Sequence, residues 1–174
     1  YTSVPNPFDT EHENYAKYFE DEFMKSIKKF GIEMDYRYQT DMYTSGAYRD
    51  DIIEAIQKRK EIFDILDSFR TQDAQEGERD AYFPVSIFCP ECHKDMTKIT
   101  SISEDGTVAE YECECGHKGT FDFKKDTGCK LAWKIDWPMR WRYEGVDFEP
   151  GGKDHASPGG SYETSSVISR KIFH

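Results

Sequence analysis

The chain has 174 residues, of which 37% are hydrophobic and 33% are charged, a balance typical of globular domains rather than of low-complexity sequence. Its net charge of −11 at pH 7 argues against a surface that coats nucleic acid, because contacts to phosphates require lysine and arginine. No apolar run approaches the roughly 20 residues of a membrane-spanning helix. The first residues lack Met and the basic and apolar stretches of a signal peptide. We therefore expect a cytoplasmic protein without membrane contact, of which this chain is an internal fragment.

The first eighty residues predict a helix, a short strand and a second helix. Apolar residues recur every three or four positions from Thr10, a helix-capping residue, to Gly31, which is suited to end a helix. Residues 32–38 alternate between apolar and polar and predict a strand. Residues 47–70 again carry an apolar face at helical spacing. Residues 71–80 offer almost nothing to bury, so we expect a solvated boundary there.

A small β unit is predicted over residues 81–128, where short β-type runs alternate with turns. The runs are residues 82–88, 97–102, 108–112 and 119–123. Asp105 and Gly106 predict a hairpin turn between the second run and the third. The chain therefore divides into residues 1–80, this β unit, and residues 129–174.

Residues 129–174 predict a return to mixed structure. Alternation of apolar and polar residues predicts strands over 131–136 and 146–149. The proline that follows Trp137 predicts that a turn or helix opens between them. The sequence from Tyr162 onward predicts a further helix.

Four of the five cysteines form two close pairs, Cys89 with Cys92 and Cys113 with Cys115. Two residues between thiolates allow both sulfurs to face one ion from a tight turn. A hairpin-length segment of 20 residues separates the pairs, as in a zinc ribbon. Without a secretory signal, this pattern favours a metal over disulfides. The four cysteines are the favoured ligands, and His117 is the alternative fourth ligand, because the gap between Cys113 and Cys115 is tighter than usual.

The zinc is expected to be structural, because four protein ligands leave no open coordination position. A β unit this small also cannot fold on an apolar core of its own. Cys129 stands apart from both pairs and is expected to be a packed thiol.

Residues 130–164 carry the most unusual composition. All three tryptophans, Trp133, Trp137 and Trp141, lie within nine residues. We expect Trp133 and Trp137 to face a pocket, whereas core packing explains Trp141 equally well. The glycines that precede Asp154 and His155 allow a ligand to approach the backbone, and these two residues supply polar groups. Taken alone, the two glycines are equally a turn signal.

Longer phrases of the sequence resemble class I lysyl-tRNA synthetases. They are Trp133-Lys-Ile-Asp-Trp137-Pro-Met-Arg-Trp141, Phe148-Glu-Pro-Gly-Gly-Lys-Asp-His155, Gly159-Gly-Ser-Tyr-Glu-Thr164, Tyr43-Thr-Ser-Gly46-Ala-Tyr48 and the cysteine-rich insert. The resemblance covers essentially the whole chain. It implies an α/β fold, in which residues 1–80 and 129–174 belong to a Rossmann-type catalytic domain and residues 81–128 are a β-rich zinc-ribbon insert.

The reaction implied by the resemblance joins lysine to ATP, with magnesium, and transfers the lysyl group from the adenylate to tRNA(Lys). Trp133 resembles the aromatic residue that lines the lysine pocket, and Trp137 is its neighbour. His155 resembles the residue that borders both lysine and adenine, while Gly152 and Asp154 are placed for the ribose or adenine. The HIGH-like and KMSKS-like signatures that stabilise the triphosphate are absent from the sequence. We therefore expect no catalytic residue here and no activity of the isolated fragment.

Two other functions remain open from the sequence. The first is a zinc-ribbon module that binds nucleic acid or a protein partner without catalysis, although mostly acidic residues flank its cysteines. The second is a class I synthetase for glutamate or arginine, against which Trp133 and the Gly-Lys-Asp-His phrase favour lysine. Deleting residues 81–128 from the full protein discriminates, because a binding module would lose all function while an enzyme could keep some lysine activation.

Overall fold

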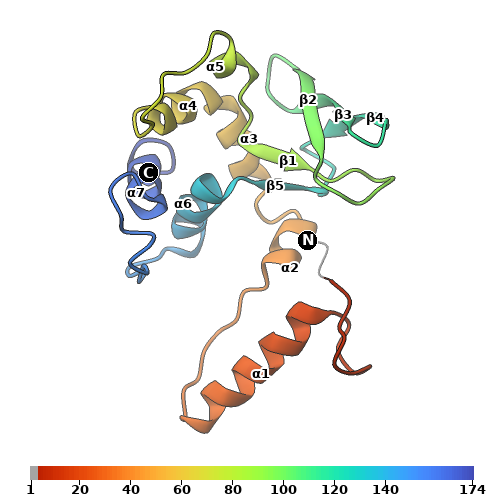
Figure 1. Ribbon diagram of the computed structural model, residues 1–174, viewed down its shortest axis with the longest axis vertical. Coiled ribbons are helices and arrows are strands. Elements are labelled where there is room, and N and C mark those ends of the chain that lie inside the picture. Colours follow the sequence, from red (N-terminus) through yellow and green to blue (C-terminus); the bar gives the residue numbers. More distant parts are fainter. Residues whose placement is uncertain (1–3) are drawn as a thin grey trace. The chain divides into compact units, whose positions relative to one another are not determined.

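The computed structural model describes residues 4–174, which fall into two compact units that divide between Met42 and Tyr43 (Figure 1). The first unit contains helix α1 (Tyr15–Lys29), and helix α2 (Gln39–Thr44) crosses the division. The second unit contains all the strands and the remaining helices. Within the described residues, no helix combines the length and the apolar character needed to cross a membrane.

The first helix begins later than the sequence predicted. Asn14, not Thr10, is the N-cap, and its side chain accepts a hydrogen bond of 3.0 Å from the backbone N–H of Lys17. The helix ends as expected, with Gly31 in the left-handed region at φ 69° just beyond the cap. The strand predicted over residues 32–38 is wrong. Within the part of the chain that is described, no strand pairs with this segment, so its alternating pattern does not lead to a ladder.

Two helices replace the single helix predicted over residues 47–70. Helix α3 (Arg49–Gln57) and helix α4 (Arg59–Asp67) meet at Lys58, whose φ of −92° and ψ of 13° interrupt the helical backbone. The predicted apolar face is nevertheless the buried face: Ile52, Ile56, Ile62 and Phe63 all lie in the core. The polar segment that follows is largely exposed and leads into the short helix α5 (Glu78–Ala81).

The strands form two antiparallel sheets. Strand β1 (Val85–Ile87) pairs with β5 (Cys129–Leu131), and Ile87 lies opposite Cys129. Strands β2 (Thr97–Ile102), β3 (Val108–Cys113) and β4 (Lys118–Asp122) follow one another in a three-stranded sheet. Gly106 has a φ of 74° in the predicted turn between β2 and β3. All pairings among the described residues are antiparallel, so this part of the chain does not form a parallel Rossmann-type sheet.

Helix α6 (Trp133–Glu144) replaces most of the strand predicted over residues 131–136, of which only Leu131 is in a strand. Tryptophan and isoleucine alternate with polar residues here, but Asp136 is buried together with its apolar neighbours. Residues 135–139 are all buried, as in a helix that is covered on all sides and not in a half-exposed strand. The strand predicted over residues 146–149 is also wrong, since these residues follow the helix without regular structure.

Helix α7 (Ser161–Lys171) packs beside α6 and confirms the helix predicted from Tyr162 (Figure 1). This packing also replaces a hydrogen bond that is missing in α6 because of Pro138. Proline has no backbone N–H, so the carbonyl group of Lys134 loses its partner in the helix. The hydroxyl group of Ser165, which is fully buried on α7, donates a hydrogen bond of 3.1 Å to that carbonyl oxygen.

Replacing Ser165 by alanine is expected to loosen the contact between α6 and α7. The carbonyl oxygen of Lys134 would stay buried without a partner, at a cost of about 1–3 kcal/mol. Hydrogen exchange measured on the full-length protein should accelerate in both helices. Ser166→Ala is the matched control, because the Ser166 hydroxyl bonds only within its own helix, to the carbonyl oxygen of Tyr162 at 2.7 Å. Equal exchange in both variants would contradict this account.

A charged cluster ties α6 to α3 and to the end of the chain. Arg142 donates to Asp51 at 2.5 Å and to Glu54 at 2.7 Å. Lys58 donates to Glu54 at 2.8 Å and to the carbonyl oxygen of Ile172 at 3.0 Å. Burial acts to raise the pKa of Glu54, but the hydrogen bonds from Arg142 and Lys58 outweigh it and hold the pKa below its ordinary value of 4.5.

The lowered pKa of Glu54 predicts a pH dependence of stability. A carboxyl group with a depressed folded-state pKa stabilises the fold above its unfolded pKa, and this contribution is lost as the pH falls through the folded pKa. Glu54→Gln should therefore lower the melting temperature above pH 5, by the equivalent of on the order of 1 kcal/mol for a partly exposed pair. The two proteins should converge well below pH 4 in thermal unfolding experiments. A difference that persists unchanged at low pH would contradict the ion pair as the cause.

Candidate functional site

Two tight turns bring four cysteines together at the edge of the three-stranded sheet. Cys89 follows β1, and the turn closes where its N–H donates to the carbonyl oxygen of Lys94 at 2.9 Å. Cys113 ends β3, and its turn closes where the N–H of Gly116 donates to the Cys113 carbonyl oxygen at 2.8 Å. Gly116 lies at φ 93°, in the left-handed region that favours glycine. Each turn thus presents two thiols toward the other.

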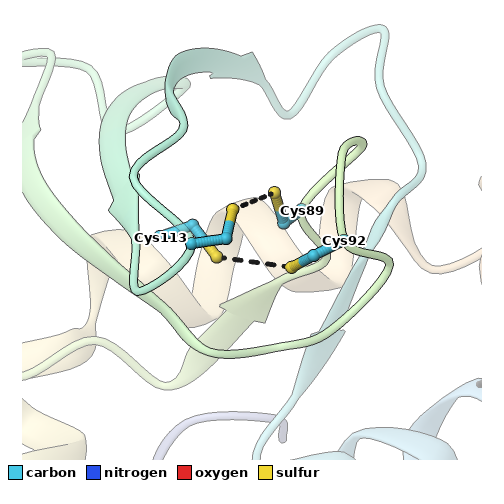
Figure 2. Close-up of side chains that lie close together, drawn as sticks. Cys89, Cys92 and Cys113 are labelled. Atoms are coloured by element: carbon cyan, nitrogen blue, oxygen red, sulfur yellow. Dashed lines mark hydrogen bonds between the residues drawn. The ribbon is translucent and has the colours of Figure 1, made fainter.

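The four sulfur atoms have the spacing of a tetrahedral metal site. Cys89 Sγ lies 3.7 Å from Cys115 Sγ, and Cys92 Sγ lies 3.6 Å from Cys113 Sγ. All four lie within 4.8 Å of one another. Figure 2 shows the side chains of Cys89 and Cys92 directed toward that of Cys113 from the other side of the centre. Four Zn–S bonds of about 2.3 Å would separate tetrahedral sulfurs by roughly 3.8 Å. All five cysteines are free thiols, so the donor set fits zinc.

The protonation of the thiols also suits a cation. Desolvation raises the pKa of Cys89, but hydrogen bonds from the backbone N–H groups of Cys92 and Glu91 and from the neighbouring thiols lower it to about 7. For Cys113, the backbone N–H of Cys115 lowers the pKa, but desolvation and the other thiols outweigh it and raise the pKa to about 12. Clustered thiols therefore resist complete ionisation, and a divalent cation among them would offset the repulsion between thiolates.

The two remaining candidates lie outside this cluster. His117 is not among the described residues whose ligand atoms gather there, and its ring lies 6.0 Å from that of Tyr111. Cys129 is buried in β5, as expected for a packed thiol, and burial raises its pKa to about 12.

The predicted substrate residues form a second cluster at the start of α6. Trp133 and Trp137 lie one helical turn apart and stack, with ring centroids 5.0 Å apart and an interplanar angle of 21°. His155 approaches Trp137 edge-on at 5.4 Å and Trp133 at 6.3 Å. Trp133 is 46% exposed, whereas Trp137 is 5% exposed. The stack therefore has a buried base and an accessible outer ring.

Hydrogen bonds hold His155 against the two tryptophans. Its Nδ1 lies 2.8 Å from the hydroxyl oxygen of Ser161, and its backbone N–H donates to the carbonyl oxygen of Gly152 at 3.0 Å. Its own carbonyl oxygen accepts from the N–H of Tyr162 at 3.0 Å. The loop is thereby fixed to the first turn of α7, and His155 is exposed.

Gly152 and Asp154 lie in the same exposed loop but are less constrained. A Cβ atom at Gly152 would meet His155 Cδ2 at an ordinary 3.7 Å, so space alone does not require glycine there. At Gly151 a Cβ would lie 3.3 Å from the Tyr162 ring, which makes this glycine the tighter of the two. Asp154 is exposed beside His155.

Sequence reasoning missed two parts of this cluster. Tyr162 packs against Trp137 and Trp141, with ring centroids 5.7 Å away in each case, and Ser161 orients His155. Both belong to a phrase that carried the family resemblance, but only proximity in space gives them a role. Trp141 packs against Trp137 at 5.2 Å and thus extends the buried base.

Comparison with known proteins identifies the class. The family described as tRNA synthetases class I (K) matches residues 1–174. The chain therefore belongs to the class I tRNA synthetases of this type.

Relatives named lysine–tRNA ligase match nearly the whole chain. The one from Treponema pallidum (strain Nichols) is 42% identical over 173 residues, covering 99% of this chain and 32% of the relative. The one from Streptomyces coelicolor is 38% identical over 195 residues, covering 96% and 34%. The one from Pyrococcus horikoshii is 37% identical over 172 residues, covering 99% and 32%. The chain thus spans about a third of the length of these relatives.

Proposed function

We propose that this chain is part of a lysine–tRNA ligase, which activates lysine with ATP and magnesium and transfers it to tRNA(Lys). The observation that carries the proposal is the meeting of Trp133, Trp137 and His155 in one accessible aromatic cluster, in a chain of this family. We further propose that residues 1–80 and 129–174 complete a Rossmann-type domain together with segments beyond this chain.

The aromatic cluster suits a ligand with a long apolar stem and a positive end. The exposed ring of Trp133 can pack against the methylene groups of lysine, and its face attracts an ammonium group. The imidazole of His155 offers a hydrogen-bonding nitrogen at the border of the stack, where the amino acid meets the nucleotide in this proposal. Gly152 and Asp154 are the proposed contacts to the ribose or adenine, since a carboxylate accepts hydrogen bonds from hydroxyl groups.

None of these residues is proposed to transfer a proton in the reaction. Adenylate formation depends on stabilising the charge that develops on the triphosphate, and this cluster instead binds and orients the amino acid. Because the chain spans about a third of its relatives, we propose that residues 1–174 alone do not form lysyl-adenylate.

We propose a structural zinc ion held by Cys89, Cys92, Cys113 and Cys115, in an insert that spans residues 81–128. The sulfur spacing supports four thiolate ligands, and the position of His117 beside Tyr111 favours this set over one with His117. Zinc would supply a cross-link between the two turns. Four reduced cysteines also suit the cytoplasm, which is the proposed compartment.

The function is tested by amino-acid-dependent exchange between pyrophosphate and ATP, measured on the full-length protein with each of the twenty amino acids. We expect exchange with lysine alone. Exchange with glutamate or arginine instead would reassign the substrate. No exchange with any amino acid would leave the non-catalytic zinc-ribbon module as the better account.

A further inference from the structure

A buried polar chain is linked to the aromatic cluster through Arg140. Tyr43 is 2% exposed and Asp136 is 3% exposed. The Tyr43 hydroxyl group donates a hydrogen bond to Asp136 Oδ1 and accepts one of 3.4 Å from the backbone N–H of Leu131. Arg140, one turn further along α6, donates from its Nε to Asp136 Oδ2 at 3.0 Å. The carboxyl group of Asp136 is therefore bonded on both oxygens, across a separation of 93 residues on the tyrosine side.

Burying such a carboxylate costs desolvation free energy, and the buried ion pair contributes little net stability. The attraction within a buried ion pair often fails to exceed the cost of removing both charges from water, and apolar residues of similar size are frequently as stable. The stretch around Asp136 is otherwise apolar and buried, with Ile135 and Met139 in the core. The polar chain is thus better explained by what it positions than by the stability that it contributes.

The polar chain positions Arg140, and Arg140 in turn positions the ring of Trp133. The Arg140 guanidinium lies over the Trp133 ring, 5.6 Å from its centroid. Trp133 is the first residue of α6 and is 46% exposed, so packing on its outer side does not fix its orientation. Stacking on Trp137 restrains the orientation of the Trp133 ring. The Arg140 guanidinium restrains it further through cation–π attraction. The Nε bond to Asp136 in turn fixes the guanidinium.

We propose that Tyr43, Asp136 and Arg140 are positioning residues that hold the Trp133 ring in the orientation that receives the aliphatic stem and ammonium group of lysine. This inference rests on the proposed function. Tyr43, a residue of α2, thereby influences the proposed amino-acid pocket without contacting the ligand, because its side chain is buried. Arg140 acts on the ligand through Trp133 and is not a catalytic residue.

Arg140→Met in the full-length protein is the direct test, because methionine keeps an unbranched side chain but removes both the cation and the bond to Asp136. Arg142→Met is the matched control on the same helix. Arg142 also bonds carboxylates, and its guanidinium lies over the Phe173 ring at 4.9 Å rather than over a tryptophan. General weakening of α6 would therefore affect both variants.

We expect Arg140→Met to raise the KM for lysine about fivefold to tenfold with a smaller change in kcat, as loss of one restraint on a binding surface implies. The KM for ATP should stay within about twofold of the unmodified protein. Arg142→Met should lower the melting temperature and leave the KM for lysine unchanged. Asp136→Asn should change the KM for lysine in the same direction, since it removes the negative charge that pairs with Arg140 and leaves one acceptor oxygen where Asp136 has two.

A second readout does not depend on activity. In protein labelled with 5-fluorotryptophan, the ¹⁹F resonance of Trp133, assigned with Trp133→Phe, should shift or broaden in Arg140→Met and remain unchanged in Arg142→Met. An unshifted Trp133 resonance together with an unchanged KM for lysine would overturn the positioning role. If the unmodified protein showed no lysine-dependent exchange, the proposed function would fail, while the ¹⁹F comparison would still report whether Arg140 orders Trp133.

Discussion

Cys113→Ser is expected to abolish stoichiometric zinc and to unfold the three-stranded sheet locally. Structural zinc sites contribute about 10–16 kcal/mol of apparent binding free energy in small peptides at neutral pH, far more than a small sheet with few buried side chains can replace. Hydrogen exchange should therefore accelerate across β2, β3 and β4 in the full-length protein. Elemental analysis of the same sample should show less than about half an equivalent of zinc.

The loss should stay local because other contacts hold the neighbouring elements. Helices α3, α4, α6 and α7 have their own apolar core, and hydrogen bonds from side chains of α3 reach the β unit. In one of these, the Gln57 side chain donates to the carbonyl oxygen of Asp105 at 2.8 Å. Exchange in α3 and α6 should therefore change little.

Cys129→Ser is the control, because Cys129 is a buried cysteine outside the cluster. It should lower stability and keep one equivalent of zinc. A further comparison addresses the fourth ligand: Cys115→Ser should lose zinc, and His117→Ala should retain it. Full zinc occupancy in Cys113→Ser, or equal zinc loss in Cys129→Ser, would contradict the proposed centre.

Trp133→Ala is expected to lower kcat/KM for lysine by about tenfold to a hundredfold in the exchange reaction, which corresponds to the loss of a hydrophobic and cation–π surface. The effect should appear chiefly in the KM for lysine, because the ring is proposed to bind the side chain in the ground state as well as in the transition state. His155→Ala should also weaken exchange, and it should raise the KM for ATP too, since His155 is proposed to border both ligands.

The conservative variant Trp133→Phe separates a binding role from a structural one. Phenylalanine keeps an aromatic face, so most of the activity should return relative to the alanine variant. Thermal unfolding should show that Trp133→Ala, Trp133→Phe and His155→Ala all remain folded. The two Trp133 variants should be tolerated because this side chain is half exposed and stacks on Trp137. Unchanged kcat/KM in Trp133→Ala would remove this residue from the lysine pocket.

The features that the sequence predicted well are those with local causes. The cysteine pairs and Gly106 act within turns of a few residues, so their spacing predicts where four sulfurs meet and where β2 turns into β3. The apolar spacing of Ile52, Ile56 and Ile62 likewise predicts the buried helical face. Within each cysteine pair, within the turn at Gly106 and along the helical face, the determining residues lie close together in the sequence.

The features that it predicted wrongly depend on partners distant in the sequence. The alternating pattern of residues 131–136 resembles a strand, but Asp136 can be buried in a helix because Tyr43 accommodates its carboxyl group. Pro138 was predicted to open a turn or helix but lies inside α6, and the buried hydroxyl group of Ser165 on α7 compensates for its missing N–H. Residues 32–38 have the composition of a strand but no neighbouring strand with which to pair among the described residues. Local propensity cannot reveal such partners.

The cluster of predicted substrate residues could be predicted only in part. The resemblance pointed to Trp133 and His155, and their rings indeed lie within 6.3 Å of each other. The supporting residues could not be predicted, because Arg140 acts through its place above Trp133 and Ser161 through its bond to His155. Arg140 lies over Trp133 within α6, and Ser161 begins α7 beside the loop that carries His155.

The central claim is tested most directly by charging purified tRNA(Lys) with radiolabelled lysine, using the full-length protein to which this chain belongs. The account predicts that lysyl-tRNA(Lys) forms in an ATP-dependent reaction, and that Trp133→Ala slows its formation at subsaturating lysine while Trp133→Phe largely restores it. Failure to form lysyl-tRNA(Lys) with a folded, zinc-replete protein would contradict the account.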